Sequence, residues 1–227
     1  MPGLDPGIHP NKNPSASQMD CRAKPGNDPW RKLAMRVASF AILFAAVIAV
    51  ASSANAADVA AGKAKAEVCA ACHGDNGISQ TENIPSLAGQ LDQYVQWQLV
   101  FFRAGARKNE QMQPIVEQLN NDDIRNLGAY FASLSPFKGG KDDNPDLSEK
   151  GKQAAAGRRC ASCHGDTFAG TKAVARIAGQ REEYLVKALH DYKSGLRSGG
   201  AQAAMADVAY PLSDEEITAL AHYLAHL

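Results

Sequence analysis

Apolar side chains recur at positions i, i+4 and i+7 in two stretches of the chain, which predicts one buried face on each of two helices. The stretches are Val95, Leu99 and Phe102 in the first half, and Leu185, Leu189 and Tyr192 in the second. Each predicted helix ends at a glycine, Gly105 or Gly195, a residue that commonly terminates helices. We identify no convincing strand, so the pattern predicts an all-α fold.

Two further helices are expected in each half. A first helix runs from near Asp58 to Cys69, and its counterpart runs from near Ser148 to Cys160; both are rich in Ala, Lys and Glu. A third helix closes each half after a capping-box signature. The two signatures are Asn120 with Asp123, and Ser213 with Glu216.

An internal repeat connects the two halves. The segment from Cys69 to Asp75 recurs from Cys160 to Asp166, and Leu87–Gln90 is answered by Ile177–Gln180. Residues 135–147 carry Pro, Gly and alternating charges without apolar spacing, which is typical of a linker. The sequence therefore predicts two domains, residues 57–134 and 148–227.

The pattern of residues near the N-terminus predicts an export signal. Arg31, Lys32 and Arg36 precede an apolar run of fifteen residues, and Ala54-Asn55-Ala56 provides a cleavage site. We expect a signal peptide over residues 35–56, removed after Ala56, and a periplasmic protein. Residues 1–34 are expected to be a non-native or disordered extension. An uncleaved membrane anchor is the alternative, although the run is shorter than the ~20 residues that span a bilayer.

Charge and composition exclude other classes. The chain has 24 basic and 24 acidic side chains, and loss of residues 1–56 leaves 18 against 21. This balance lacks the basic patch expected of a nucleic-acid-binding protein. Apolar residues are few for two cores of about 80 residues, and domains of this size usually need a metal or a large cofactor.

The repeated Cys-x-x-Cys-His pattern indicates that cofactor. Two thiols three residues apart can add to the vinyl groups of haem, and the adjacent His can bind the iron. Zinc or a redox dithiol is the alternative. Two copies in an exported chain, with Cys21 lost alongside the leader, favour two covalently bound haem c groups. The residues are Cys69, Cys72 and His73, and Cys160, Cys163 and His164.

The sixth iron ligands are predicted from the same repeat. Met112 and Met205 are the only methionines after the leader, one in each half, between the second and third predicted helices. A thioether opposite an imidazole raises the reduction potential, which suits electron transfer. For the second iron, His190, His222 and His226 are competing ligands, although we interpret all three as surface positions.

Together these motifs resemble the two-haem cytochrome c4 group. The resemblance implies two tandem class I cytochrome c domains related by a pseudo-twofold axis, and electron transfer between periplasmic respiratory complexes. It also implies that a proline carbonyl holds the haem-ligating His, which matches Pro85 in the first half. Ala175 replaces that proline in the second half, where another carbonyl can serve.

The predicted function is therefore an electron carrier with no catalytic residues, whose partners are a redox donor and acceptor such as a respiratory complex, a terminal oxidase or a dehydrogenase. An electron-accepting subunit of a periplasmic dehydrogenase, for example a flavocytochrome, is the alternative. A haem enzyme with an open iron and a zinc-binding module are less favoured.

Side chains near the predicted haems are mostly interpreted as structural. We expect Tyr94, Trp97 and Phe101 to pack on the first haem or on the other domain. Arg107 and Arg197 are expected either to neutralise haem propionates or to lie on the surface.

Overall fold

The computed structural model describes residues 56–198 and 203–227. The predicted extension and all but the last residue of the predicted signal peptide lie outside these ranges. The described residues form helices and loops without a named strand, and Thr171 and Val174 form an isolated antiparallel bridge. The all-α prediction is confirmed.

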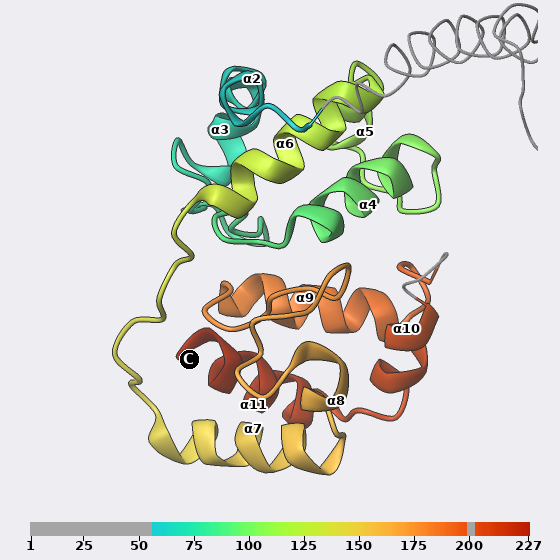
Figure 1. Ribbon diagram of the computed structural model, residues 1–227. Helices are drawn as coiled ribbons and strands as arrows, with labels where there is room; N and C mark the ends of the chain where they lie inside the picture. Colours follow the sequence, from blue (N-terminus) through green and yellow to red (C-terminus); the bar gives the residue numbers. More distant parts are fainter. Residues whose placement is uncertain (1–55, 199–202) are drawn as a thin grey trace, which may run out of the picture. The chain divides into compact units, whose positions relative to one another are not determined.

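The first half contains five helices (Figure 1). The terminal helices α2 and α6 pack against each other, and α4 packs against α6. An apolar core forms where these helices meet, and it includes Val95, Phe102, Ile124 and Leu127. The helices are α2 Val59–Lys65, α3 Glu67–His73, α4 Asp92–Arg103, α5 Gln113–Val116 and α6 Asn121–Ser133.

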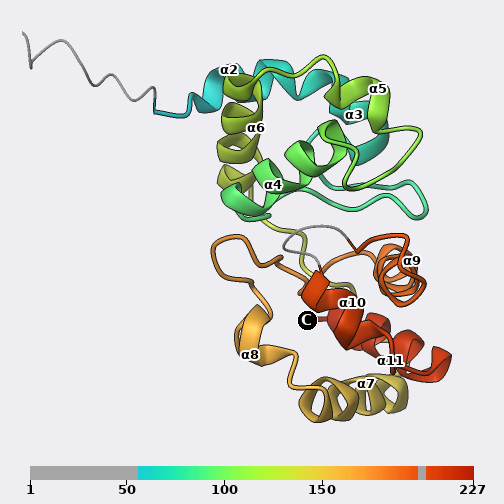
Figure 2. The ribbon, with the colours of Figure 1, turned by 90° about the vertical axis from the view of Figure 1, so that its right-hand side faces the viewer.

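The second half repeats this order. The helices α7 and α11 lie side by side, as Figures 1 and 2 both show, and α9 packs on α11 and α10. A separate core includes Leu185, Tyr192, Ile217 and Leu220. The helices are α7 Pro145–Gly157, α8 Ala161–His164, α9 Glu182–Lys193, α10 Ala203–Ala209 and α11 Asp214–Ala225.

The local signals for helix ends are confirmed. Both predicted capping boxes form, at the starts of α6 and α11. Gly105 and Gly195 adopt φ values of +71° and +78° just after α4 and α9, a conformation that costs glycine little.

Three predicted boundaries are corrected. The helix expected from Asp58 to Cys69 is divided at Ala66, which caps both α2 and α3. The helix expected from Ser148 to Cys160 begins at Pro145 and ends at Gly157, because the Asn144 side chain caps it and Pro145 fits its first turn. The last three residues assigned to the linker thus belong to α7.

A glycine allows the first and last helices of each half to approach closely. A Cβ at Gly62 in α2 would lie 2.1 Å from the Asn126 carbonyl oxygen of α6. A Cβ at Gly151 in α7 would lie 2.0 Å from the Ala219 carbonyl oxygen of α11. Both crossings therefore depend on the absence of a side chain.

In the described part of the chain, no helix is long and apolar enough to cross a membrane.

Candidate functional site

Each Cys-x-x-Cys-His segment lies on a short helix that ends in a glycine. Cys69, Cys72 and His73 lie on α3, and Gly74 follows at φ +83°. In the second half, Cys160 is the N-cap of α8, and Gly165 follows the helix at φ +78°. The chain therefore turns sharply after each histidine, at a residue that tolerates the left-handed conformation.

The two cysteines of each pair differ in exposure. Cys69 and Cys160 are half-buried and pack on the cores of their own halves, whereas Cys72 and Cys163 are exposed. Burial, with a smaller contribution from the charge of Cys72, raises the pKa of the Cys69 thiol to about 11. Burial also raises the pKa of Cys160. All four cysteines are free of disulfides, so they are available for covalent attachment.

Both histidines are buried, and each is oriented by one backbone carbonyl. Nδ1 of His73 lies 2.8 Å from the Pro85 oxygen, and Nδ1 of His164 lies 2.8 Å from the Ala175 oxygen. Burial lowers the pKa of both rings, more than the carbonyls raise it. A neutral ring that donates from Nδ1 has its lone pair on Nε2, which is the form that binds a metal. Ala175 thus provides the same acceptor as Pro85.

The two methionines occupy similar environments. Met112 is half-buried, precedes α5 and packs on the core that contains Cys69. Met205 is half-buried, lies within α10 and packs on the core that contains Cys160. The loops expected around both methionines thus contain short helices. In each half, one cysteine and one methionine pack on the same apolar core, and the half also offers a second thiol and an imidazole nitrogen, a donor set that fits haem c.

Arg197 is buried, which excludes the surface location, one of its two expected environments. Its guanidinium donates to the Tyr94 hydroxyl and Gln98 Oε1 of the first half, both at 2.9 Å, and to the Tyr184 hydroxyl at 3.3 Å. Arg107 donates to the same Gln98 oxygen at 2.6 Å and to Tyr184 at 3.2 Å. Although burial raises the pKa of Tyr184, the two arginines outweigh it and bring the pKa to about 8.

The three aromatic residues of α4 that were expected to pack on the first haem or on the other domain are Tyr94, Trp97 and Phe101. Tyr94 contacts the other domain through Arg197, as one of the two expectations stated. Trp97 stacks on Phe101 with ring centroids 5.6 Å apart, but it is 49% exposed. Trp97 therefore presents much of its ring to solvent, which the sequence interpretation did not predict.

Two glutamines join the halves reciprocally, and the sequence marked them only as repeat positions. Gln180 Oε1 accepts from the Ser86 N–H at 2.8 Å, and Gln180 Nε2 donates to the Ser86 oxygen at 2.9 Å. Gln90 makes the equivalent pair with Arg176, at 2.8 and 2.9 Å. The Leu/Ile-Ala-Gly-Gln repeat was the sequence signal that could have indicated this contact. A glutamine repeated at the same position in both halves is not needed to fill an apolar core, so a polar role could have been inferred for it.

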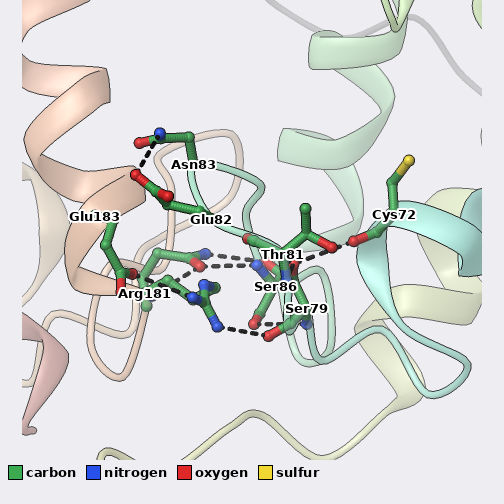
Figure 3. A network of polar contacts seen from close by, with 9 residues as sticks. Cys72, Ser79, Thr81, Glu82, Asn83, Ser86, Arg181 and Glu183 are labelled. Carbon is green, nitrogen blue, oxygen red and sulfur yellow. Dashed lines mark hydrogen bonds and ion pairs between the residues drawn. The ribbon is translucent and has the colours of Figure 1, made fainter.

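The first-half segment next to Pro85 is held by the other half at a second point. The Arg181 guanidinium donates to the Ser79 oxygen at 2.9 Å, and Figure 3 shows Arg181 beside Ser79 and Ser86. The Ser79 hydroxyl donates in turn to the Cys72 oxygen at 3.1 Å. The chain between the cysteine motif and Pro85 is thus fixed from both sides.

The competing histidines of the second half occupy distinct places. His190 is exposed, as interpreted. His222 is only 4% exposed, which corrects the surface interpretation. Its Nδ1 lies 3.1 Å from Glu182 and its Nε2 lies 3.1 Å from Asp142. Burial lowers the pKa of His222, but the two carboxylates outweigh it and raise the pKa. Both ring nitrogens of His222 are therefore engaged by carboxylates.

Comparison with known proteins identifies the repeated unit. The cytochrome c family model matches residues 59–135 and again residues 148–227. Cytochrome c4 of Azotobacter vinelandii is 34% identical over 191 residues, which cover 76% of this chain and 90% of that protein. The crystal structure of reduced recombinant cytochrome c4 from Pseudomonas stutzeri superposes with a TM-score of 0.69 at 32% identity, covering 76% of this chain and all of that one.

A second group of relatives acts with an enzyme. The thiosulfate dehydrogenase electron acceptor of Stutzerimonas stutzeri is 30% identical over 172 residues, covering 71% of this chain and 80% of that protein.

Proposed function

The chain belongs to the cytochrome c family, has two such domains in the manner of cytochrome c4 and is a dihaem electron carrier, and we propose axial ligands for its two irons. These ligands are His73 with Met112 for one iron and His164 with Met205 for the other. The cofactors are two covalently bound haem c groups, and the zinc alternative is set aside. The observation that carries the assignment is the repeated donor set. In each half, one cysteine and one methionine pack on the same core.

The protein's own residues hold and orient the ligands. When bound, each haem c supplies an iron that takes up and releases one electron. The Pro85 and Ala175 carbonyls fix the two imidazoles with Nε2 free for the iron. Burial of both rings keeps them neutral and excludes water. A thioether and a neutral imidazole together favour the reduced state, which suits transfer of an electron without bond chemistry.

The second methionine is assigned over the histidines because of their contacts. Both ring nitrogens of His222 lie 3.1 Å from carboxylate oxygens, of Glu182 and Asp142. His226 uses Nδ1 for the His222 carbonyl at 2.8 Å, and His190 is exposed. Met205, in contrast, packs with the core that contains Cys160.

Replacing Met205 with alanine in the haem-loaded protein is expected to halve the weak far-red absorption of the sulfur-to-ferric-iron transition. The second potential is expected to fall, because a water or an empty position stabilises the reduced iron less than a thioether does. Met112→Ala is the matched variant and is expected to remove the other half of the band. An unchanged band in Met205→Ala, with two haems present by mass, would show that another residue binds the second iron.

For the cellular role, the proposal is a periplasmic carrier that exchanges electrons with larger redox proteins of a respiratory chain, without an enzymatic activity of its own. The near balance of acidic and basic side chains is compatible with such exchange, since modest long-range steering allows release after each encounter.

A second candidate function has a specific observation in its favour. The relatives that are electron acceptors of thiosulfate dehydrogenase match the same two-domain region. In this case the chain would receive electrons from a periplasmic dehydrogenase. Stable co-purification with such an enzyme would favour this role over that of a freely diffusing carrier.

A further inference from the structure

A single peptide group in each half connects the haem-ligating histidine to the opposite domain. The peptide between Pro85 and Ser86 accepts from His73 through its C=O and donates to Gln180 through its N–H, both at 2.8 Å. The peptide between Ala175 and Arg176 accepts from His164 and donates to Gln90, again at 2.8 Å. The two connections cross, so each domain's histidine is linked to the other domain's glutamine.

The carboxamides are fixed in orientation. Gln180 Oε1 also accepts from its own neighbour, the Arg181 N–H, at 3.0 Å, while its Nε2 donates to the Ser86 oxygen. Gln90 Oε1 accepts from the Leu91 N–H at 3.1 Å in the same manner. In each carboxamide the oxygen accepts from two N–H groups and the nitrogen faces a carbonyl. Exchanging the two atoms would place donor against donor, so only one orientation of each carboxamide is chemically consistent.

Burial strengthens the connection electrostatically. Gln90, Gln180 and Ser86 are 6 to 8% exposed, so water does not compete for these hydrogen bonds. In such surroundings, a peptide that donates its N–H becomes a better acceptor at its C=O, because hydrogen bonds in series polarise one another. A stronger acceptor at Nδ1 makes the imidazole a more electron-rich ligand, which favours the oxidised metal.

We propose that Gln180 and Gln90 are positioning residues that set, crosswise, the potential of the haem in the opposite domain. The inference rests on the axial roles assigned above to His73 and His164. Through the shared peptide groups, each domain contributes to the electronic state of the other's iron, so docking of the two domains is part of how both potentials are defined.

The test measures both potentials and the His73 ring protons of the haem-loaded protein by NMR. Gln180→Met keeps the side-chain length but removes the carboxamide. It is expected to raise the potential of the first haem, speed the hydrogen exchange of the His73 Nδ1–H, and leave the second haem unchanged. Gln90→Met is the matched variant and should act on the second haem alone. Gln180→Glu keeps the acceptor and adds charge, so it should shift the first potential downward.

The outcomes separate the positioning role from the ligand assignment. His73 ring protons without the large haem-induced shift would refute the axial role itself. Shifted ring protons, with a first potential that is equal in Gln180→Met and the parent protein, would refute only the positioning role. A change in potential confined to the haem of the domain that carries the substitution, or equal at both haems, would also overturn the positioning role.

A separate cluster, remote in sequence from the haem motifs, has the donors of a cation site. One possible ligand atom from each of Asp142, His222 and His226 lies within 4.8 Å of the other two. His222 and His226 are four residues apart at the end of α11, with ring centroids 4.3 Å apart. Asp142 reaches this helix end from the linker, with an oxygen 3.1 Å from His222 Nε2.

Both histidines have an acceptor at Nδ1. Glu182 lies 3.1 Å from Nδ1 of His222, and the His222 carbonyl lies 2.8 Å from Nδ1 of His226. A carboxylate or carbonyl at Nδ1 leaves Nε2 to bind, as in many zinc sites. Two histidines at i, i+4 and one carboxylate are typical zinc ligands. The Asp143 carboxylate, 3.8 Å from His222, adds negative charge.

We infer that this cluster binds one Zn²⁺ through Asp142, His222 and His226, and thereby fastens the linker to the last helix. Binding would release to solvent the proton shared between His222 Nε2 and Asp142, and water would complete the tetrahedral shell.

Calorimetric titration of the haem-loaded protein with ZnCl₂ tests this site. One equivalent is expected to bind. His226→Gln and Asp142→Asn should each weaken binding at least tenfold, and Glu182→Gln should weaken it about 10- to 100-fold by disturbing His222. His190→Gln, at an exposed histidine of the same domain, should leave binding unchanged. Absence of binding, or equal binding by all four variants as expected for haem propionates, would overturn the inference.

Discussion

Gly151→Ala is expected to destabilise the second domain by about 3 kcal/mol, because the added methyl group would collide with the backbone of α11. Its Cβ would lie 2.0 Å from the Ala219 carbonyl oxygen and 2.6 Å from Tyr223 Cβ. Neither group is the mobile end of a side chain, so α7 and α11 would have to move apart along their whole contact. Denaturant unfolding of the haem-loaded protein, followed by circular dichroism, measures the loss.

The same helix offers a matched control. Gly157 lies at the end of α7, and a Cβ there would meet nothing within 4 Å. Gly157→Ala is therefore expected to be neutral or to stabilise by up to about 1 kcal/mol through helix propensity. Gly62→Ala should reproduce the large loss in the first domain, since its Cβ would lie 2.1 Å from the Asn126 oxygen. Similar small effects at Gly151 and Gly157 would contradict the close crossing.

Arg197→Met is expected to cost about 3 kcal/mol of stability, because it removes the donor to the Tyr94 hydroxyl and leaves Gln98 and Tyr184 with Arg107 alone. Arg197 is 4% exposed and donates to Tyr94, Gln98 and Tyr184. Its guanidinium also lies 4.5 Å from the centre of the Tyr192 ring, a contact that methionine retains only in part. Thermal and denaturant unfolding of the haem-loaded variant provide the measurement.

Two variants show whether the loss comes from the buried hydrogen bonds. Arg159→Met removes one positive charge at an exposed position of the same domain and is expected to change stability by less than about 0.5 kcal/mol. Arg197→Lys keeps the charge but cannot reach several acceptors at once, so it should recover only part of the loss. If Arg197→Lys were as stable as the parent protein, charge alone would account for the effect.

The features that the sequence determined are all local in the chain. The Cys-x-x-Cys-His spacing indicated two haem c groups because both thiols and the imidazole come from one helical turn, whose geometry is the same in any fold. The capping boxes at Asn120 and Ser213 and the glycines after α4 and α9 could be predicted for the same reason. Because the sequence repeats, each of these predictions for one half also applied to the other half.

Two features that depend on residues far apart in the chain differ from the sequence interpretation. His222 was placed on the surface because a polar residue on a closing helix is usually exposed, yet Asp142 of the linker and Glu182 of α9 cover it. Arg197 was expected either beside the haem propionates or on the surface, and the surface location is wrong, since Tyr94 and Gln98 of the other domain accept hydrogen bonds from its buried guanidinium. Burial of a charged group requires partners that a sequence does not bring together.

The sequence by itself thus determined the chemistry of this protein: which cysteines attach the haems, and how many haems there are. Only the tertiary structure decided how the two sites are joined, through Gln90 and Gln180 acting on peptide groups about 90 positions away. The physical reason is the separation along the chain of the residues that interact. Helix periodicity and motif spacing act over a few residues, whereas the hydrogen bonds that connect the halves exist only once both domains have folded and excluded water from between them.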